Sequence, residues 1–211
     1  MTQNDKTVDL AENLWKRLRS GKPPSGRHPQ ICGDIPMSIN RDGTWYYQGG
    51  PIGRMELVKL FSTVLQRDED GGHWLVTPAE MARIEVEDAA FVVVEVVRDS
   101  VNSETSINTG PTDQVDSVAK TDIIRMRTNI DQWVELDENH PLRVEENPET
   151  GEPSPYIALD RGLEARLNRA SFYQLVDWAE EITAPDSTQT AIGVYSHGRF
   201  FKIGTVENDD V

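Results

Sequence analysis

The stretch from Arg41 to Leu65, RDGTWYYQGGPIGRMELVKLFSTVL, most constrains the fold because several local signals follow one another in it. Asp42-Gly43 predicts a hairpin with a type I′ turn, which needs positive φ at both central residues. The aromatic run WYY then predicts a return strand, and Gly49-Gly50-Pro51 interrupts it. Apolar residues recur at helical spacing from Arg54 to Gln66. The stretch therefore predicts a hairpin followed by an amphipathic helix.

A similar order of signals occurs near the C-terminus. Two short strands are predicted between Tyr156 and Leu167, then a helix from Arg169 to Ile182, then a hairpin from Ala191 to Val206. Hairpin, helix and hairpin thus occur twice, over 39–77 and 156–204, with Arg54 and Arg169 at matching helix starts. This repeated order predicts an internal duplication.

Most of the remaining chain has the alternation of half-buried strands, with a helix predicted at 8–20 and strands from residue 82 onward. The segment 99–120 is rich in Ser, Thr, Asn and Asp and predicts a flexible excursion between two paired strands. Asn147–Pro155, NPETGEPSP, has the composition of a linker. We therefore expect an α+β protein with an N-terminal helix and linker (1–30), a first β-rich subdomain (31–146) and a second one with the repeated motif (147–211).

Composition limits the classes of partner. The 211 residues include 21 Lys and Arg against 36 Asp and Glu, a net charge of −15, and such a field repels a phosphate backbone. Cys32 is the one cysteine, which fits a reducing compartment. The N-terminal residues lack a signal-peptide pattern, and no apolar run approaches the roughly 20 residues that span a bilayer. We expect a cytoplasmic protein that binds neither nucleic acid nor membrane.

The glycine-rich loop before the first helix is the strongest candidate binding site. Gly49, Gly50 and Gly53 lie between a strand and a helix N-terminus, where free N–H groups and the helix dipole attract anions. Arg54 would add a bidentate contact to a phosphate or carboxylate. The alternative is a simple bend, with the glycines satisfying backbone angles and Arg54 paired with an acidic neighbour.

A second group of candidates would line a cleft if the two halves face each other. They are Arg41 and Tyr47 in the first half and Asn129, His140 and Arg143 on the segment that joins the halves. For Tyr47 the alternative is a core position, because Trp45 and Tyr47 alternate with Tyr46. For His140 the alternative is a loop position with hydrogen bonds to backbone groups.

The sequence contains no recognisable catalytic, cofactor or metal motif. No two of the four histidines have the spacing of a zinc site, and 68–79 lacks the glutamate and the central glycine of a calcium loop. There is no G-x-S-x-G motif, and no histidine lies closer to Cys32 than His28. We expect a protein without enzymatic activity.

Three blocks of sequence resemble a bacterial family catalogued only as domain-of-unknown-function family 1285. They are CGDIPMSINRDGTWYYQGGPIGRMELVKLFSTVLQRDEDGGHWLVTPAE, RTNIDQWVELDENHPLRV and GVYSHGRFFKIG, within residues 31–206. The resemblance implies a two-part α+β fold with duplicated motifs and a second part loosely like a pleckstrin-homology barrel. It also implies a pocket at the interface of the parts for a nucleotide-like ligand, and a signalling role.

These observations lead to two functional expectations. The first is a non-catalytic module for ligand binding and signalling that holds a small anionic, nucleotide-like molecule between its two parts. The second is a protein–protein adaptor without a small ligand, which would use exposed strand edges or the acidic excursion 99–120.

Overall fold

The computed structural model describes residues 6–7, 9, 12–13, 15–16, 29–101, 121–183 and 189–207. The chain divides into two compact units. Unit 1 comprises Met1–Val92, Thr128–Gln132 and Ala158–Arg166, and unit 2 comprises Val93–Arg127, Trp133–Ile157 and Leu167–Val211. The helix expected at 8–20 lies largely outside the described residues, and those of its residues that are described are helical.

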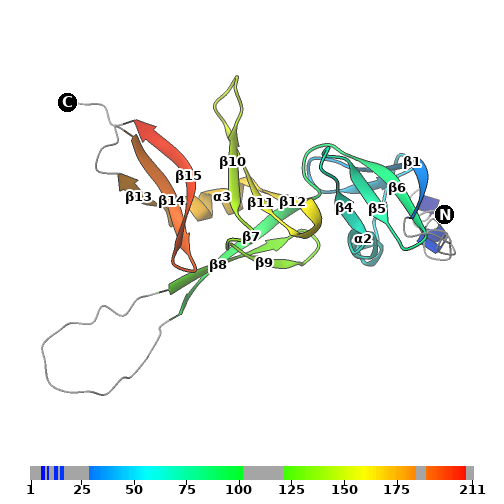
Figure 1. The fold of residues 1–211 in the computed structure, drawn as a ribbon, viewed down its shortest axis with the longest axis horizontal. Coiled ribbons are helices and arrows are strands. Elements are labelled where there is room, and N and C mark those ends of the chain that lie inside the picture. The colour runs from blue at the N-terminus through cyan, green and yellow to red at the C-terminus, as the bar shows by residue number, and fades with distance from the viewer. Residues whose placement is uncertain are drawn as a thin grey trace, which may run out of the picture. The chain divides into compact units, whose positions relative to one another are not determined.

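Unit 1 contains a six-stranded sheet in the order β3-β2-β1-β6-β5-β4 (Figure 1). Its strands are β1 (Gln30–Ile39), β2 (Trp45–Tyr47), β3 (Gly50–Pro51), β4 (Leu65–Arg67), β5 (His73–Val76) and β6 (Glu80–Val86). Strands β1 and β6 pair in parallel at the centre, and the other neighbours pair antiparallel. Segments far apart in the sequence therefore form the middle of this sheet.

One face of this sheet packs on the helix α2 (Met55–Ser62). Trp45 and Tyr47 are buried and Tyr46 between them is not, because successive side chains of a strand point to opposite faces; for Tyr47 this is the core alternative. The Trp45 ring stacks on Phe61 of α2, with ring centroids 6.3 Å apart. Burying a large apolar side chain of this kind contributes roughly 1.5–3 kcal/mol. The alternating pattern of β2 and the helical pattern of α2 thus meet in one core.

The turn between β1 and β2 differs from the expected type I′ turn. Gly43 has a φ of +80°, but Asp42 does not have positive φ. Strands β1 and β2 begin pairing at Ile39 and Trp45, so five residues connect them. The Asp42 carboxylate accepts a hydrogen bond from the Thr44 N–H at 2.8 Å, which stabilises this longer loop and removes the need for a second left-handed residue.

A second six-stranded sheet has the order β10-β11-β12-β7-β8-β9. Its strands are β7 (Phe91–Val101), β8 (Thr121–Thr128), β9 (Trp133–Glu135), β10 (Leu142–Glu146), β11 (Pro153–Ala158) and β12 (Glu164–Leu167). The short 3-10 helix η1 (Asp160–Gly162) connects β11 to β12. Strands β7 and β8 are neighbours, as expected for the strands that flank the excursion. Residues 99–101 belong to β7, and the rest of the excursion lies outside the described residues.

The C-terminal part of unit 2 contains the helix α3 (Arg169–Val176) and a three-stranded sheet. The strands are β13 (Glu180–Thr183), β14 (Gln189–Ser196) and β15 (Arg199–Glu207), which pair antiparallel in that order. Asn168 caps α3, because its side chain accepts a hydrogen bond from the Ser171 N–H at 2.8 Å. The expected hairpin at 191–206 is confirmed, with its turn at His197 and Gly198.

Both helices are shorter than expected, and both are followed by a strand. The expected helix at 54–66 ends at Ser62, and Leu65 pairs with Leu75 in the sheet. The expected helix at 169–182 ends at Val176, and Ile182 belongs to β13. Pairing with a neighbouring strand buries Leu65 as completely as a helix would, so apolar spacing alone misplaced the helix end.

The described elements repeat an order: three strands, a helix and three strands. The first series runs from β1 through α2 to β6, and the second runs from β10 through α3 to β15. The protein is therefore mostly β, with few helices and a repeat-like arrangement of two parts. None of the described helices is long and apolar enough to span a membrane.

The division of the chain falls elsewhere than expected. Strands β10 and β11 lie on either side of the segment 147–152 and pair with each other, from Leu142 with Ile157 to Glu146 with Pro153. The expected linker is therefore the turn of a hairpin, and the compact units separate at Val92 and Val93 instead. A turn and a linker share a composition of Pro, Gly and Asn, which is why the sequence pattern did not distinguish them.

Candidate functional site

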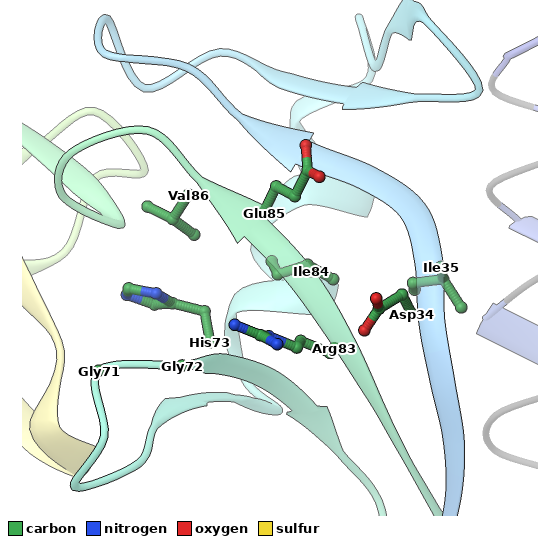
Figure 2. Close-up of a pocket in the computed structure, with 9 residues that line it drawn as sticks. All are labelled: Asp34, Ile35, Gly71, Gly72, His73, Arg83, Ile84, Glu85 and Val86. Carbon is green, nitrogen blue, oxygen red and sulfur yellow. The ribbon is translucent and has the colours of Figure 1, made fainter.

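A hollow with charged lining lies in unit 1, over strand β6. Its volume is about 360 Å³, and its lining comes from β1, β6 and the turn before β5. The lining residues are Asp34, Ile35, Gly71, Gly72, His73, Arg83, Ile84, Glu85 and Val86. Figure 2 shows Asp34 and Arg83 on neighbouring strands, with His73 beyond the Arg83 guanidinium and Glu85 further along β6. This volume falls within the range of small-molecule pockets.

An irregularity in β1 opens this hollow. Asp34 pairs with Arg83 and Ser38 pairs with Glu85, so β1 has residues 35–37 where β6 has Ile84 alone. The surplus residues form a bulge, which bends a strand and redirects its side chains. Gly33 with a φ of +77° and Pro36, which lacks an N–H, fit an irregular strand. The local sequence of β1 therefore positions Asp34 at the rim.

His73 is a buried residue of the lining. His73 is 8% exposed. It is the first residue of β5 and directly follows Gly71 and Gly72. The pKa of His73 is lowered from 6.5 to about 4, first by burial and then by the positive charge of Arg67, while Asp68 acts in the opposite direction. The ring is therefore neutral at pH 7 and offers one N–H donor and one acceptor nitrogen.

Asp68 holds the turn that forms one wall of the hollow. Its carboxylate accepts hydrogen bonds from the Trp74 indole N–H at 2.7 Å and from the Gly72 N–H at 2.6 Å. These two bonds, the one from Trp74 first, lower the pKa of Asp68. A Cβ atom at Gly72 would lie 2.9 Å from this carboxylate, so only glycine fits there without displacing it.

Arg83 is distinctive among the described arginines. The eleven other arginines of the described ranges donate hydrogen bonds or form ion pairs, for example Arg54 with Glu12 and Arg67 with Glu164. Arg83 makes no hydrogen bond and no ion pair with any described residue. In a chain with an excess of carboxylates this leaves a guanidinium available at the hollow, and a guanidinium binds carboxylate or phosphate through two parallel hydrogen bonds.

The predicted glycine loop lies in unit 1 before α2. Arg54 forms ion pairs with Glu12 and, at 4.0 Å, with Glu56, which is the arrangement of the bend alternative. A Cβ atom at Gly50 would lie 2.2 Å from the Oγ1 atom of Thr7, so this glycine makes room for the N-terminal helix. Gly49 has a φ of +77° in the turn, and Gly53 is exposed. A binding role for this loop stays a prediction.

Three other predicted residues of unit 1 make structural contacts. Tyr47 is 8% exposed and lies in the core. Arg41 bonds Asp88 through its Nε atom at 3.2 Å. The Asn129 side chain accepts a hydrogen bond from the Val92 N–H and donates one to the Gly43 carbonyl, both at 3.1 Å. Asn129 thus joins the turn after β1 to the start of β7.

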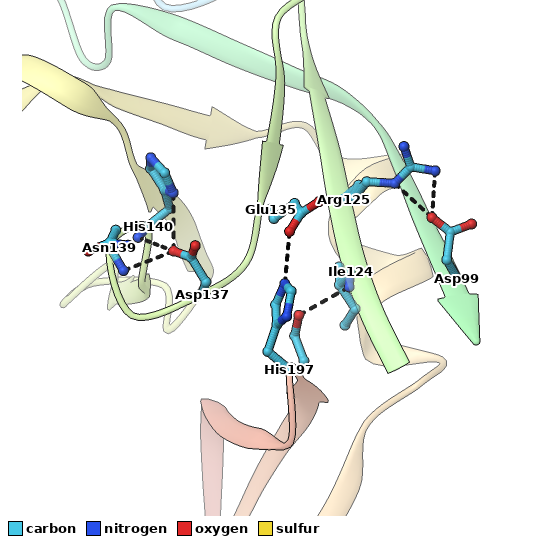
Figure 3. A network of polar contacts seen from close by, with 9 residues as sticks. Asp99, Ile124, Arg125, Glu135, Asp137, Asn139, His140 and His197 are labelled. Atoms are coloured by element: carbon cyan, nitrogen blue, oxygen red, sulfur yellow. Dashed lines mark hydrogen bonds and ion pairs between the residues drawn. The ribbon is translucent and has the colours of Figure 1, made fainter. Parts of the chain in front are cut away.

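His140 and Arg143 belong to unit 2. The Asp137 carboxylate binds the His140 ring at 3.1 Å and the His140 N–H at 2.8 Å, which closes a tight loop (Figure 3). The Arg143 guanidinium lies over the Tyr156 ring, 4.4 Å from its centroid, and pairs with Glu145. Figure 3 also shows His197 in contact with Glu135 at 2.9 Å. His140 and Arg143 therefore each belong to a local network of contacts, and their binding role stays a prediction.

Sequence reasoning missed the residues around the hollow. Asp34, His73, Arg83 and Glu85 come from three strands that pair only in the folded chain. Gly33 and Pro36 inside a predicted strand were the available signal for a bulge. Among the described residues no three His, Cys, Asp or Glu side chains are grouped so that they could hold a metal ion.

The fold and the hollow define a mostly β, two-part protein with a hollow of charged lining in its first part. Comparison with known families identifies it further. Residues 23–89 match the model described as "Domain of unknown function (DUF1285), N-terminal domain". Residues 112–203 match "Protein of unknown function (DUF1285), C-terminal domain". The expected boundary at 146/147 falls inside the second match.

A solved structure of 36% sequence identity agrees with this assignment. A DUF1285 family protein from Silicibacter pomeroyi DSS-3 is 36% identical, over 91% of this chain and 93% of that chain, with a TM-score of 0.68. A DUF1285 family protein from Shewanella baltica OS155 is 26% identical, over 68% of this chain and 91% of that chain, with a TM-score of 0.48. A search of the curated proteins found no match. The chain belongs to the DUF1285 family, and the resemblance of the three sequence blocks is confirmed.

Proposed function

We propose that this protein is a non-catalytic ligand-binding module, and that Arg83 binds the anionic group of a small molecule in the hollow of unit 1. The supporting observation is that Arg83 lines a hollow of about 360 Å³ and has no hydrogen bond or ion pair among the described residues. A guanidinium with free donors gains about 1.5–3 kcal/mol from a hydrogen bond to a charged partner.

His73 supports the same proposal. Because its imidazole is neutral at pH 7, it lines the hollow without adding charge. The walls, from β1, β6 and the Gly71-Gly72 turn, belong to one compact unit. The hollow therefore needs no contribution from unit 2, unlike the interfacial position expected from the sequence.

Four more specific expectations from the sequence are part of this proposal. They are a nucleotide-like ligand, a signalling role in the cytoplasm, the duplicated hairpin–helix–hairpin motif and a pleckstrin-homology-like second part. The order of three strands, helix and three strands, which occurs twice, supports the duplication. The acidic net charge of −15 supports a small ligand over nucleic acid.

A thermal-shift panel of small anions tests the proposal, with Arg83→Gln and Arg54→Gln as matched variants. We expect at least one nucleotide, phosphate or carboxylate compound to raise the Tm of the wild type. Arg83→Gln should abolish that shift, and Arg54→Gln should retain it because Arg54 is already paired with Glu12. Loss of the shift in Arg54→Gln alone would place the site at the glycine loop instead. No response of the wild type to the whole panel would count against ligand binding.

The alternative, a protein–protein adaptor, has one observation in its favour. Strand β13 is at the edge of its sheet, and all four of its residues are exposed, including Ile182 at 37%. An edge strand has free N–H and C=O groups that can pair with another chain. Affinity capture of a stoichiometric partner by the full-length chain, together with a silent small-molecule panel, would favour this function.

A further inference from the structure

The hollow is lined by charges of both signs, and these charges indicate which kind of ligand it would bind. Asp34, Arg83 and Glu85 all line it, and all three residues are exposed. None of the three forms a hydrogen bond or an ion pair with a described residue. Asp34 and Arg83 are nonetheless direct partners in the register of β1 and β6.

Two opposite charges in register on neighbouring strands ordinarily attract each other into contact. Here the register shifts on either side of Asp34, both side chains line the hollow, and neither has a hydrogen bond or ion pair with a described residue. Figure 2 shows the Asp34 carboxylate on one side of Arg83 and Glu85 at the far end of β6.

The balance of these charges disfavours a simple anion. Arg83 contributes +1, and Asp34 and Glu85 contribute −1 each, so with a neutral His73 the lining has a net charge of −1. An anion bound to Arg83 is repelled by two carboxylates, whereas a molecule that also has N–H donors gains from them. A ligand with both kinds of group is complementary to the whole hollow.

We propose that the ligand is amphoteric: its carboxylate or phosphate binds Arg83, and an ammonium or amino N–H group of the same molecule binds Asp34 and Glu85. This inference rests on the proposed function, because it takes Arg83 as the anion-binding group. Amino acids and nucleotides with an amino-substituted base share this chemistry, and the experiment distinguishes them.

Calorimetric titrations with matched pairs of compounds test the inference on the full-length protein. One arm compares α-amino acids with the corresponding 2-hydroxy acids. The other compares guanosine and adenosine monophosphate with inosine and purine riboside monophosphate, which lack the amino group. In the wild type, the amino member of at least one pair should bind about tenfold more tightly, as expected for a hydrogen bond to a charged acceptor. Inorganic phosphate serves as the simple anion.

Three variants separate this inference from the proposed function. The double variant Asp34→Asn/Glu85→Gln should lose the preference for the amino compound and should bind phosphate at least as tightly as the wild type, because two repelling charges are gone. Arg83→Gln should lose both ligands. The control Glu149→Gln/Asp177→Asn removes the same charge at exposed positions of unit 2 and should keep wild-type affinities. Circular dichroism melting checks that each variant is folded.

Two results would overturn the inference while the proposed function stands. One is a wild type that binds both members of every pair equally. The other is a double variant that retains the preference for the amino compound. If Arg83→Gln binds every compound as the wild type does, the proposed function fails and the inference fails with it.

Discussion

His73 shows how the position of one side chain sets both a charge state and a dependence on pH. The same residue type occurs at His140 and His197, which lie 23% and 37% exposed at their side chains, whereas His73 is buried at the start of β5. Burial disfavours the charged imidazolium, and Arg67 on the paired strand adds repulsion. Protonation of His73 therefore opposes folding.

The stability of the protein should consequently fall on acidification through the titration of His73. Because the pKa is 6.5 when unfolded and about 4 when folded, the unfolded chain binds the extra proton in this window. The stabilisation is complete above pH 6.5 and is lost as the pH falls through about 4. Urea unfolding of wild type and His73→Gln at pH 7, 5 and 4 should show a pH-dependent difference on the order of 3 kcal/mol. Parallel curves for the two proteins would contradict this assignment.

Arg54 and Arg83 illustrate at the same scale why residue type alone does not identify a site. Both are exposed arginines beside glycines, and Arg54 has the better local signal because a helix begins after it. In the folded chain each of them lines a hollow, but Arg54 pairs with Glu12, whereas Arg83 has no ion pair with a described residue. The difference arises from which neighbours the fold brings to each guanidinium.

Among the elements, the hairpin β14–β15 depends on a glycine inside a strand. Gly193 lies at a register shift between β14 and β15, and a Cβ atom there would lie 2.3 Å from the Phe201 carbonyl oxygen and 2.6 Å from the Phe200 ring. Gly204 lies in the paired strand and has no atom within 4 Å of such a Cβ. The two strands therefore contain a crowded glycine and an uncrowded one.

Substitution of these glycines by alanine should have very different effects. Gly193→Ala forces backbone and ring to move apart, which should cost about 1–3 kcal/mol or more of unfolding free energy. Gly204→Ala should change stability by less than about 1 kcal/mol, because the new methyl group meets open space. Chemical denaturation of the two variants measures the difference. Equal effects would show that the close contact with Phe200 and Phe201 does not determine the packing of this hairpin.

In the molecule as a whole, the compact units are not continuous in sequence. Residues 158–166 return to unit 1, where the Arg161 guanidinium donates to the carbonyls of Ser62, at 3.0 Å, and Thr63. These carbonyls lie at the C-terminal end of α2, where cations are favourable and acceptors lack helical partners. A segment distant in sequence thus completes the end of this helix.

Arg161→Ala should therefore destabilise unit 1 although it lies far from α2 in the sequence. Loss of two hydrogen bonds from a charged donor should lower the unfolding free energy by about 1–3 kcal/mol. Arg199→Ala is the control, because Arg199 pairs with the exposed carboxylate of Glu138 and such surface pairs contribute less than about 1 kcal/mol. Hydrogen exchange at the amides of 63–65 reports the local effect. Unchanged exchange there would exclude a role of Arg161 at the end of α2.

Much of the local structure follows from the sequence alone. Alternation predicted most strands, and in β2 it predicted that Trp45 and Tyr47 lie on one face and Tyr46 on the other. The turns at Gly43 and Gly198 followed from residues that adopt positive φ. These features depend on interactions within a few residues, which a sequence pattern contains completely.

The tertiary structure decided which strands are neighbours, and with them the ends of the helices, the division of the chain and the candidate site. Leu65 has the spacing of a helix, but its pairing with Leu75 makes it part of a strand. Asp34 and Arg83 line one hollow because β1 and β6 pair in parallel with a bulge. The sequence of neither strand specifies the other strand as its partner. The physical reason is that local periodicity determines which face of an element is apolar, whereas its partner depends on burial and hydrogen bonding over the whole chain.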